Sequence, residues 1–208
     1  MAATGYDKNV FINCPFDDDY KPLFDAVVFA VHDCGFRVRC ALEEEDSGAV
    51  RVTKLYKIIS ECRLGIHDIS RTEVSRDSLL PRFNMPLELG VFLGARQYGS
   101  GRQKQKRCLI LDRERYRYQQ YISDLAGQDP KAHHNDTAKA IQCVRDWLSH
   151  HGNKGVTLPG PAAMVSRYRR FKKQLPAILK ACDIKPGELI YNDYTTFVVA
   201  WLKEHPWG

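Results

Sequence analysis

The sequence lacks long apolar runs. No stretch approaches the roughly 18 consecutive apolar residues of a membrane span, and residues 1–9 lack the apolar core of a secretory signal. The chain has 208 residues, of which 44% are hydrophobic and 27% charged, so it can bury one sizeable core, with or without an appended subdomain. We therefore expect a cytoplasmic globular protein with no membrane segment.

Paired cysteine motifs are also missing. The seven cysteines are scattered and contain no CxxC pair, which argues against a zinc site, a redox motif or a disulfide framework. We interpret most of them as reduced core residues. His133 and His134, with Asp129 and Asn135 nearby, can in principle bind a metal, but we prefer a polar loop before a helix and predict no metal.

The common cofactor and hydrolase motifs are absent as well. Neither the Rossmann nor the P-loop glycine spacing occurs, Gly-x-Ser-x-Gly and HExxH are missing, and no Ser-His-Asp set stands out. Enzymes that phosphorylate or transfer hydride are therefore disfavoured, and we predict no cofactor.

Positive charge is in modest excess, with a net charge of +6. It comes largely from two clusters, residues 102–107 and 167–173. The first is typical of a solvated loop that enters a strand. The second begins a helix whose charges are dense on all sides, and no aromatic stacking platform accompanies them. We interpret both as surface features and disfavour direct nucleic-acid binding.

Short apolar segments alternate with segments of helical periodicity through the first half of the chain. The pattern predicts strands at 9–14, 36–42, 64–69 and 107–112, and helices between them at 20–34, 50–60 and 85–98. Such alternation favours the α/β class, a parallel sheet flanked by helices on both faces. Residues 114–208 are more helical, so we expect an α/β core at 1–113 and a mainly helical extension at 114–208 packed on it.

Polar residues follow the predicted strands at their carboxyl ends, where α/β sheets bind ligands. The loop after the first strand, with an amide, a rigid turn and an aromatic ring, is suited to a nucleobase or ribose. After the third strand an acid can accept hydrogen bonds from ribose hydroxyls and a guanidinium can pair with phosphate. Ordinary capped turns are the alternative. The candidate binding residues are Asn13, Pro15, Phe16, Asp68, Ser70, Arg71 and Asn84.

Glu88 stands alone among apolar residues at the start of the helix predicted at 85–98. Desolvation by neighbours such as Met85 and Phe92 should raise its pKa, and such a carboxyl can act as nucleophile or acid/base. The alternative is a solvated glutamate in the first turn that suits the helix dipole. Beside groups suited to a nucleoside, Glu88 indicates N-glycosidic bond cleavage, in which the carboxylate stabilises or captures an oxocarbenium-like ribosyl centre.

Three patches within residues 9–112 resemble the nucleoside 2-deoxyribosyltransferase-like group and the related bacterial Toll/interleukin-receptor (TIR) domains. They are FINCPF at 11–16, CRLGIHDIS at 62–70, and LELG at 87–90 with LGA at 93–95. The resemblance implies a flavodoxin-like sheet. In both families the glutamate at the place of Glu88 is catalytic, as nucleophile in the transferases and as the residue required for NAD cleavage in active TIR domains.

Other family positions differ. The transferases carry an aspartate six residues before the glutamate, where this chain has Arg82, with Asn84 nearby as a substitute; two further family positions fall on Glu61 and Val10. These departures favour a different glycoside, and NAD is our leading candidate, as a substrate and not a cofactor. Nucleoside 2-deoxyribosyl transfer and a non-enzymatic module that binds a nucleotide signal or a partner stay open.

The resemblance also implies a setting. Bacterial TIR-like NAD hydrolases commonly serve anti-phage defence, act as homo-oligomers and answer to an activating partner protein. An arginine such as Arg39, Arg71 or Arg82 would then hold the pyrophosphate of NAD.

Overall fold

A parallel sheet lies at the centre of the structure, a computed structural model that describes residues 5–43, 48, 50–72, 82–151 and 157–207. Within these residues the sheet has five strands in the order β2-β1-β3-β4-β5, and every pairing is parallel. The strands are β1 Asn9–Asn13, β2 Arg37–Arg39, β3 Leu64–Asp68, β4 Arg107–Asp112 and β5 Lys131–Ala132. This order is that of flavodoxin-like folds, which confirms the predicted α/β class.

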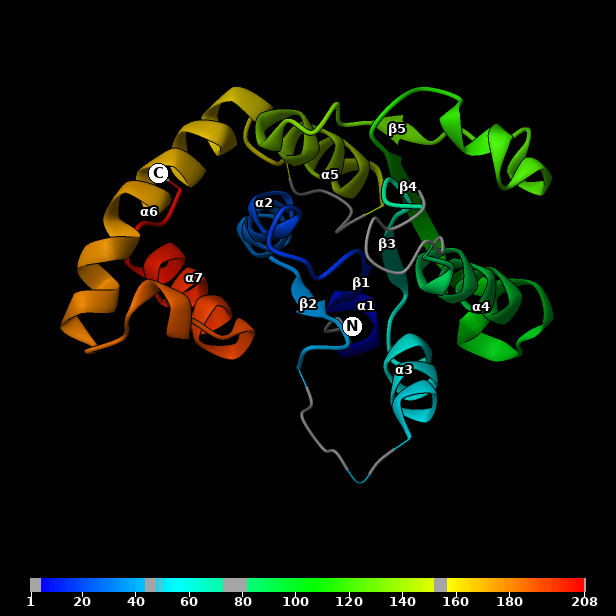
Figure 1. The fold of residues 1–208 in the computed structure, drawn as a ribbon, viewed down its shortest axis with the longest axis horizontal. Coiled ribbons are helices and arrows are strands. Elements are labelled where there is room, and N and C mark those ends of the chain that lie inside the picture. The colour runs from blue at the N-terminus through cyan, green and yellow to red at the C-terminus, as the bar shows by residue number, and fades with distance from the viewer. Residues whose placement is uncertain (1–4, 44–47, 49, 73–81, 152–156, 208) are drawn as a thin grey trace.

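Helices cover both faces of the sheet (Figure 1). One face packs against α2 and α5, and the other against α3 and α4. The described helices are α1 Gly5–Lys8, α2 Lys21–Asp33, α3 Arg51–Ser60, α4 Asn84–Tyr98, α5 Thr137–His151, α6 Pro161–Ala181 and α7 Tyr191–Glu204; short 3₁₀ turns are η1 Gly101–Gln105, η2 Arg117–Gln120, η3 Ser123–Leu125 and η4 Pro186–Glu188.

Successive side chains of a strand point to opposite faces of the sheet, so they pack against different helices. Val10 and Ile12 of β1 join the cluster with α2 and α5, whereas Phe11 between them packs with α3 and with Phe92 of α4. All three side chains are buried, as expected for a parallel sheet that is covered on both faces. The strands and helices predicted before residue 113 are therefore confirmed, with ends shifted by a few residues.

The sheet extends past residue 113, where the sequence pattern places the end of the α/β core. β5 pairs with β4, with Leu111 opposite Lys131, and α5 packs directly on α2. The sequence did not predict β5, because its two residues are too few for an alternating pattern. The helical layer that we expected consists of α6 and α7, which lie beyond α2 (Figure 1), where Phe171 and Trp201 contact Phe29.

The structure also shows the state of the cysteines and of the basic segment 102–107. All seven cysteines are free thiols, and four of them are buried, as predicted. The basic segment 102–107 is not solvated throughout, because Lys106 is fully buried and donates from Nζ to the carbonyls of Ile59 and Cys62, each at 2.5 Å. Among the described helices, none combines the length and apolar character that a bilayer crossing requires.

Candidate functional site around Glu88

The helix that carries Glu88 lies close to the sheet because β3 has a glycine beneath it. A Cβ on Gly65 would lie 2.8 Å from ring atoms of Phe92 and 2.8 Å from Nε2 of His67. Real Cβ atoms essentially never make such contacts. Gly65 therefore allows the Phe92 ring to rest on the strand, which fixes the distance between α4 and the sheet.

Asn13, at the end of β1, holds the first turn of α4. Its Nδ2 donates to the backbone oxygen of Met85 at 2.8 Å and lies 3.1 Å from Nδ1 of His67. Nδ1 of His67 therefore accepts, and the imidazole is neutral with its proton on Nε2. Burial, and then the charge of Lys106, lower the pKa of His67 to about 3. His67 is thus a core histidine, and Asn13, one of the candidate binding residues, positions α4.

Glu88 lies three residues beyond Met85, in a groove of about 200 Å³ between α3 and α4. Leu55, Ile59 and Val91 form apolar walls, and Arg51 and Asn84 supply the other strongly polar groups among the described lining residues. Burial raises the pKa of Glu88 to about 7, against a smaller lowering by Arg51. The predicted raised pKa is therefore confirmed, and the solvated first-turn alternative is wrong, because Glu88 is half-buried and is the fifth residue of α4.

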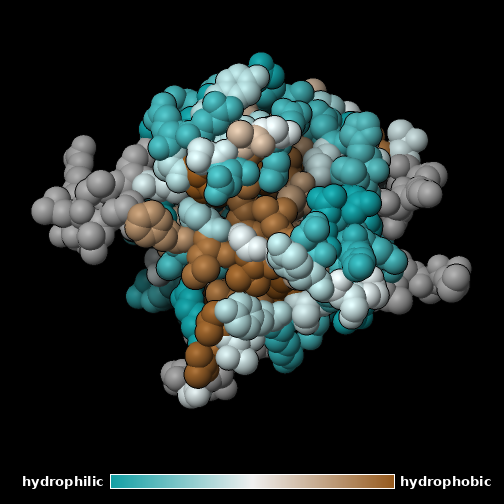
Figure 2. Space-filling view, turned by 90° about the vertical axis from the view of Figure 1, so that its right-hand side faces the viewer, coloured by the Kyte–Doolittle hydropathy of each residue, from teal (hydrophilic) through white to brown (hydrophobic). Residues whose placement is uncertain are grey.

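Exposed apolar side chains surround this groove. Val52 and Tyr56 of α3 are 40% and 51% exposed, and Leu87 of α4 is 62% exposed. Figure 2 shows a continuous apolar area on the side of the molecule to which α4 belongs. Apolar walls around a few polar groups are typical of small-molecule sites.

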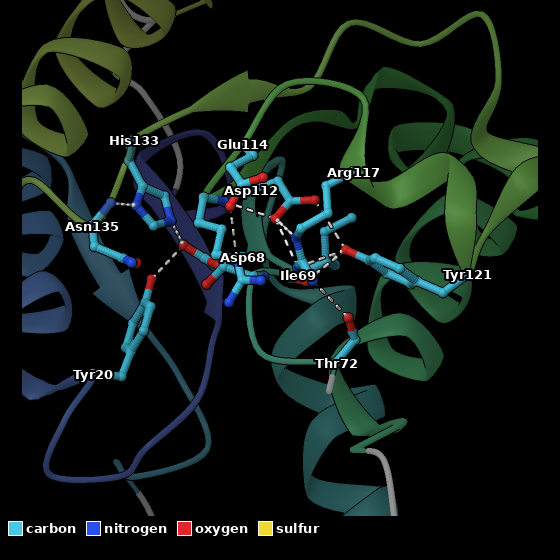
Figure 3. A network of polar contacts seen from close by, with 12 residues as sticks. Tyr20, Asp68, Ile69, Thr72, Asp112, Glu114, Arg117, Tyr121, His133 and Asn135 are labelled. Carbon is cyan, nitrogen blue, oxygen red and sulfur yellow. Dashed lines mark hydrogen bonds and ion pairs between the residues drawn. The ribbon is translucent and has the colours of Figure 1, made fainter. Parts of the chain in front are cut away.

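Asp68, at the end of β3, belongs to a buried network and does not line this groove (Figure 3). Its carboxylate accepts from the Tyr20 hydroxyl at 2.5 Å and from the Ser70 amide at 2.8 Å, and Nε2 of His133 lies 3.0 Å away. Burial alone would raise the pKa of Asp68, but the hydrogen bonds and charge from His133, with those from Ser70 and Tyr20, lower it. Asp68 and the Ser70 amide are therefore engaged by contacts within the chain, and their predicted contact with ribose stays a prediction.

His133 lies in the loop before α5, as predicted, but its side chain is fully buried. Its Nδ1 accepts from the amide of Asn135 at 3.0 Å, which leaves the proton on Nε2, toward Asp68. Sequence reasoning missed this pair because 65 positions of chain separate Asp68 from His133 and no local pattern joins them.

A second part of the network joins the ends of β3 and β4. Nε of Arg117 donates to Asp112 at 2.8 Å and its Nη2 to the carbonyl of Ile69 at 2.9 Å. The Tyr121 hydroxyl is 2.9 Å from the same carbonyl and 3.0 Å from Asp112 (Figure 3). These residues pair with one another within the chain and so join the segments that follow β3 and β4.

The remaining candidates lie apart from Glu88. Pro15 and Phe16 line a different pocket, of about 320 Å³, against Tyr191 of α7. Arg71 lies 3.7 Å from Asp17 and 3.6 Å from Asp19. Of the candidate binding residues that the sequence suggested, only Asn84 lines the groove with Glu88.

The arginines considered for pyrophosphate also have acidic partners. Arg39 pairs with Glu43 and Glu61, and Arg82 pairs with Asp17 at 2.8 Å. In the described part of the chain, no three His, Cys, Asp or Glu side chains form a group that could hold a metal ion. Comparison of the chain with protein-family models, with curated proteins and with solved structures gave no match.

Proposed function

We propose that the protein cleaves the N-glycosidic bond of NAD or a related nucleotide, with Glu88 as the catalytic carboxyl. The observation that carries the proposal is this half-buried acid in an apolar groove, with its pKa raised to about 7. Perturbed carboxyls in clefts are frequent in catalytic sites. The resemblance of residues 87–95 to the catalytic segment of the transferases and TIR domains supports the same role.

The composition of the groove favours NAD over a neutral nucleoside. Glycoside hydrolysis usually needs one acid for the leaving group and a second carboxylate for the sugar. Glu88 is the only acid among the described residues that line the groove. Nicotinamide leaves NAD as a neutral base, taking the electron pair of the C1′–N bond, so no acid has to protonate it. One ionised carboxylate then suffices to stabilise or capture the ribosyl cation.

The reaction then requires only water as second substrate. The C1′–N bond breaks, the carboxylate of Glu88 faces the cationic C1′, and water supplies the oxygen of the new C1′–O bond and releases a proton. The groove, at about 200 Å³, is smaller than the roughly 300–1,000 Å³ of whole-ligand sites. It would hold the nicotinamide end of the dinucleotide, while Arg51, exposed beside it, pairs with the pyrophosphate.

The test is incubation of the purified protein with NAD and chromatographic detection of free nicotinamide. Glu88→Gln keeps the shape and removes the charge, so nicotinamide release should fall by about a hundredfold or more. Glu204→Gln, at an exposed site on α7, is the matched control and should keep the wild-type rate. An unchanged rate in Glu88→Gln would remove Glu88 from the mechanism. If the protein exchanged bases between deoxyadenosine and cytosine and released no nicotinamide, its activity would instead be nucleoside 2-deoxyribosyl transfer.

A further inference from the structure

A second cavity is larger than the groove around Glu88. It has a volume of about 720 Å³ and lies between the edge of the sheet at β5 and the helix α5. This volume falls within the range of sites that enclose a whole small molecule. Its lining contains none of the residues of the Glu88 groove, so it is a separate site.

Cationic side chains reach this cavity from three elements. Arg115 follows β4, Lys131 belongs to β5 and Lys139 to the first turn of α5, and all three are exposed. Among the described lining residues they face one acid, Asp146, which is itself 3.1 Å from Arg145. Outside the lining, Lys131 pairs with Asp129 at 2.5 Å, so the three cations still outnumber the two acids. The cavity therefore carries an excess of positive charge, which attracts an anionic ligand.

An aromatic side chain lines the same cavity. Lys139, Cys143 and Trp147 repeat every four residues along α5 and so share one helix face. Trp147 is partly buried, and its ring lies 5.6 Å from that of His151. A tryptophan held in this way can stack on a flat ring, as in other sites that take bases. Charge for an anion and a surface for a ring thus occur in one cavity.

The wall at the end of β5 is fixed by the buried network described above. His134, which lines the cavity, has a φ of 52°, and Asn135 has a φ of 56°. Left-handed conformations of non-glycine residues persist only where their surroundings impose them. Here His133 does so, because it binds the Asn135 amide on one side and Asp68 on the other. The cavity is thus preformed.

We propose that this cavity binds a nucleotide, with its phosphates on Lys131, Lys139 and Arg115 and its base on Trp147. The proposal is independent of the chemistry at Glu88. The probes are ADP, adenosine and inorganic phosphate, titrated separately into the full-length protein by calorimetry. ADP should bind more tightly than either fragment, because only ADP uses both the cationic groups and the ring.

Surface variants give the decisive comparison. Lys131→Gln with Lys139→Gln should weaken ADP binding about tenfold or more, because two charge-assisted contacts are lost. Lys203→Gln on α7, also exposed, should leave it unchanged. Trp147→Phe should weaken the binding of ADP more than the binding of inorganic phosphate.

Two results would overturn the proposal: no heat of binding with ADP at millimolar concentration, or wild-type affinity in the double lysine variant. Equal affinity for ADP and inorganic phosphate would remove the base contact with Trp147 and leave only an anion site. Nicotinamide release from NAD plays no part in any of these measurements, so failure here and failure of the glycosidase proposal are distinguishable.

Discussion

Nε2 of His133 lies 3.0 Å from Oδ2 of Asp68, and both side chains are buried. The pair joins the end of β3 to the loop that follows β5, so it connects the switch-point end of the sheet to the start of α5. Tyr20, just before α2, contributes to the same carboxylate. One acid thus anchors three loops.

Removal of His133 should therefore destabilise the fold. His133→Ala leaves a buried carboxylate with fewer donors and opens a cavity, and we expect a loss of about 2–4 kcal/mol in the free energy of unfolding. Urea denaturation followed by circular dichroism measures it. His150→Ala, at an exposed position near the end of α5, is the control and should change stability by less than about 0.5 kcal/mol. If both substitutions changed the free energy of unfolding by the same small amount, the contact between Asp68 and His133 would contribute little to stability.

The same pair should set the acid stability of the protein. The pKa of Asp68 is lowered from 3.8 in the folded protein, so its contribution to stability is present above pH 3.8 and is lost as pH falls further. In His133→Ala the pKa of Asp68 should rise, and the loss should begin at a higher pH. Unfolding free energies measured between about pH 2 and 7 test this. Parallel curves for the wild type and the variant would contradict it.

The sequence predicted the α/β core because apolar strands and amphipathic helices leave periodic patterns. It also identified Glu88, because an acid among Met85, Leu87 and Leu89 breaks such a pattern. It did not predict the contact between Asp68 and His133, because that contact joins loops far apart in the chain. It placed Asn13 correctly at the carboxyl end of a strand, but only the structure shows that the Asn13 amide donates to the backbone of Met85.

Glu88→Gln should stabilise the protein at alkaline pH. The pKa of Glu88 is raised from 4.5 to about 7, so the folded state resists its ionisation and stability falls as pH rises through this window. One pKa unit corresponds to about 1.4 kcal/mol; with an allowance for solvent screening at this half-buried site, we expect a gain of about 1–2 kcal/mol at pH 8. At pH 4 the wild type and Glu88→Gln should have nearly equal free energies of unfolding. A variant that is less stable at pH 8 would contradict the burial argument.

Arg51 should tune the acidity of Glu88. Its charge lowers the pKa of Glu88 against the effect of burial, so Arg51→Gln should raise that pKa and Arg51→Lys should largely preserve it. A carboxylate acting in its ionised form then needs a higher pH, and the rise of the pH–rate profile for NAD cleavage should move to higher pH. Titration of Glu88 by carbon-13 NMR measures the shift without reference to activity. An unchanged titration in Arg51→Gln would show that the two charges do not interact.

The contact between Gly65 and Phe92 should control both stability and the placement of Glu88. Gly65→Ala introduces a methyl group 2.8 Å from the Phe92 ring, so the ring or α4 has to move, and we expect a loss of about 1–3 kcal/mol. Phe92→Leu removes ring atoms at this point and should itself destabilise the core. Because the smaller side chain makes room for the new methyl group, the double variant should lose less than the sum of the two single losses. Denaturation of all four proteins completes this cycle, and strictly additive losses would show that α4 is not held at the distance that Gly65 permits.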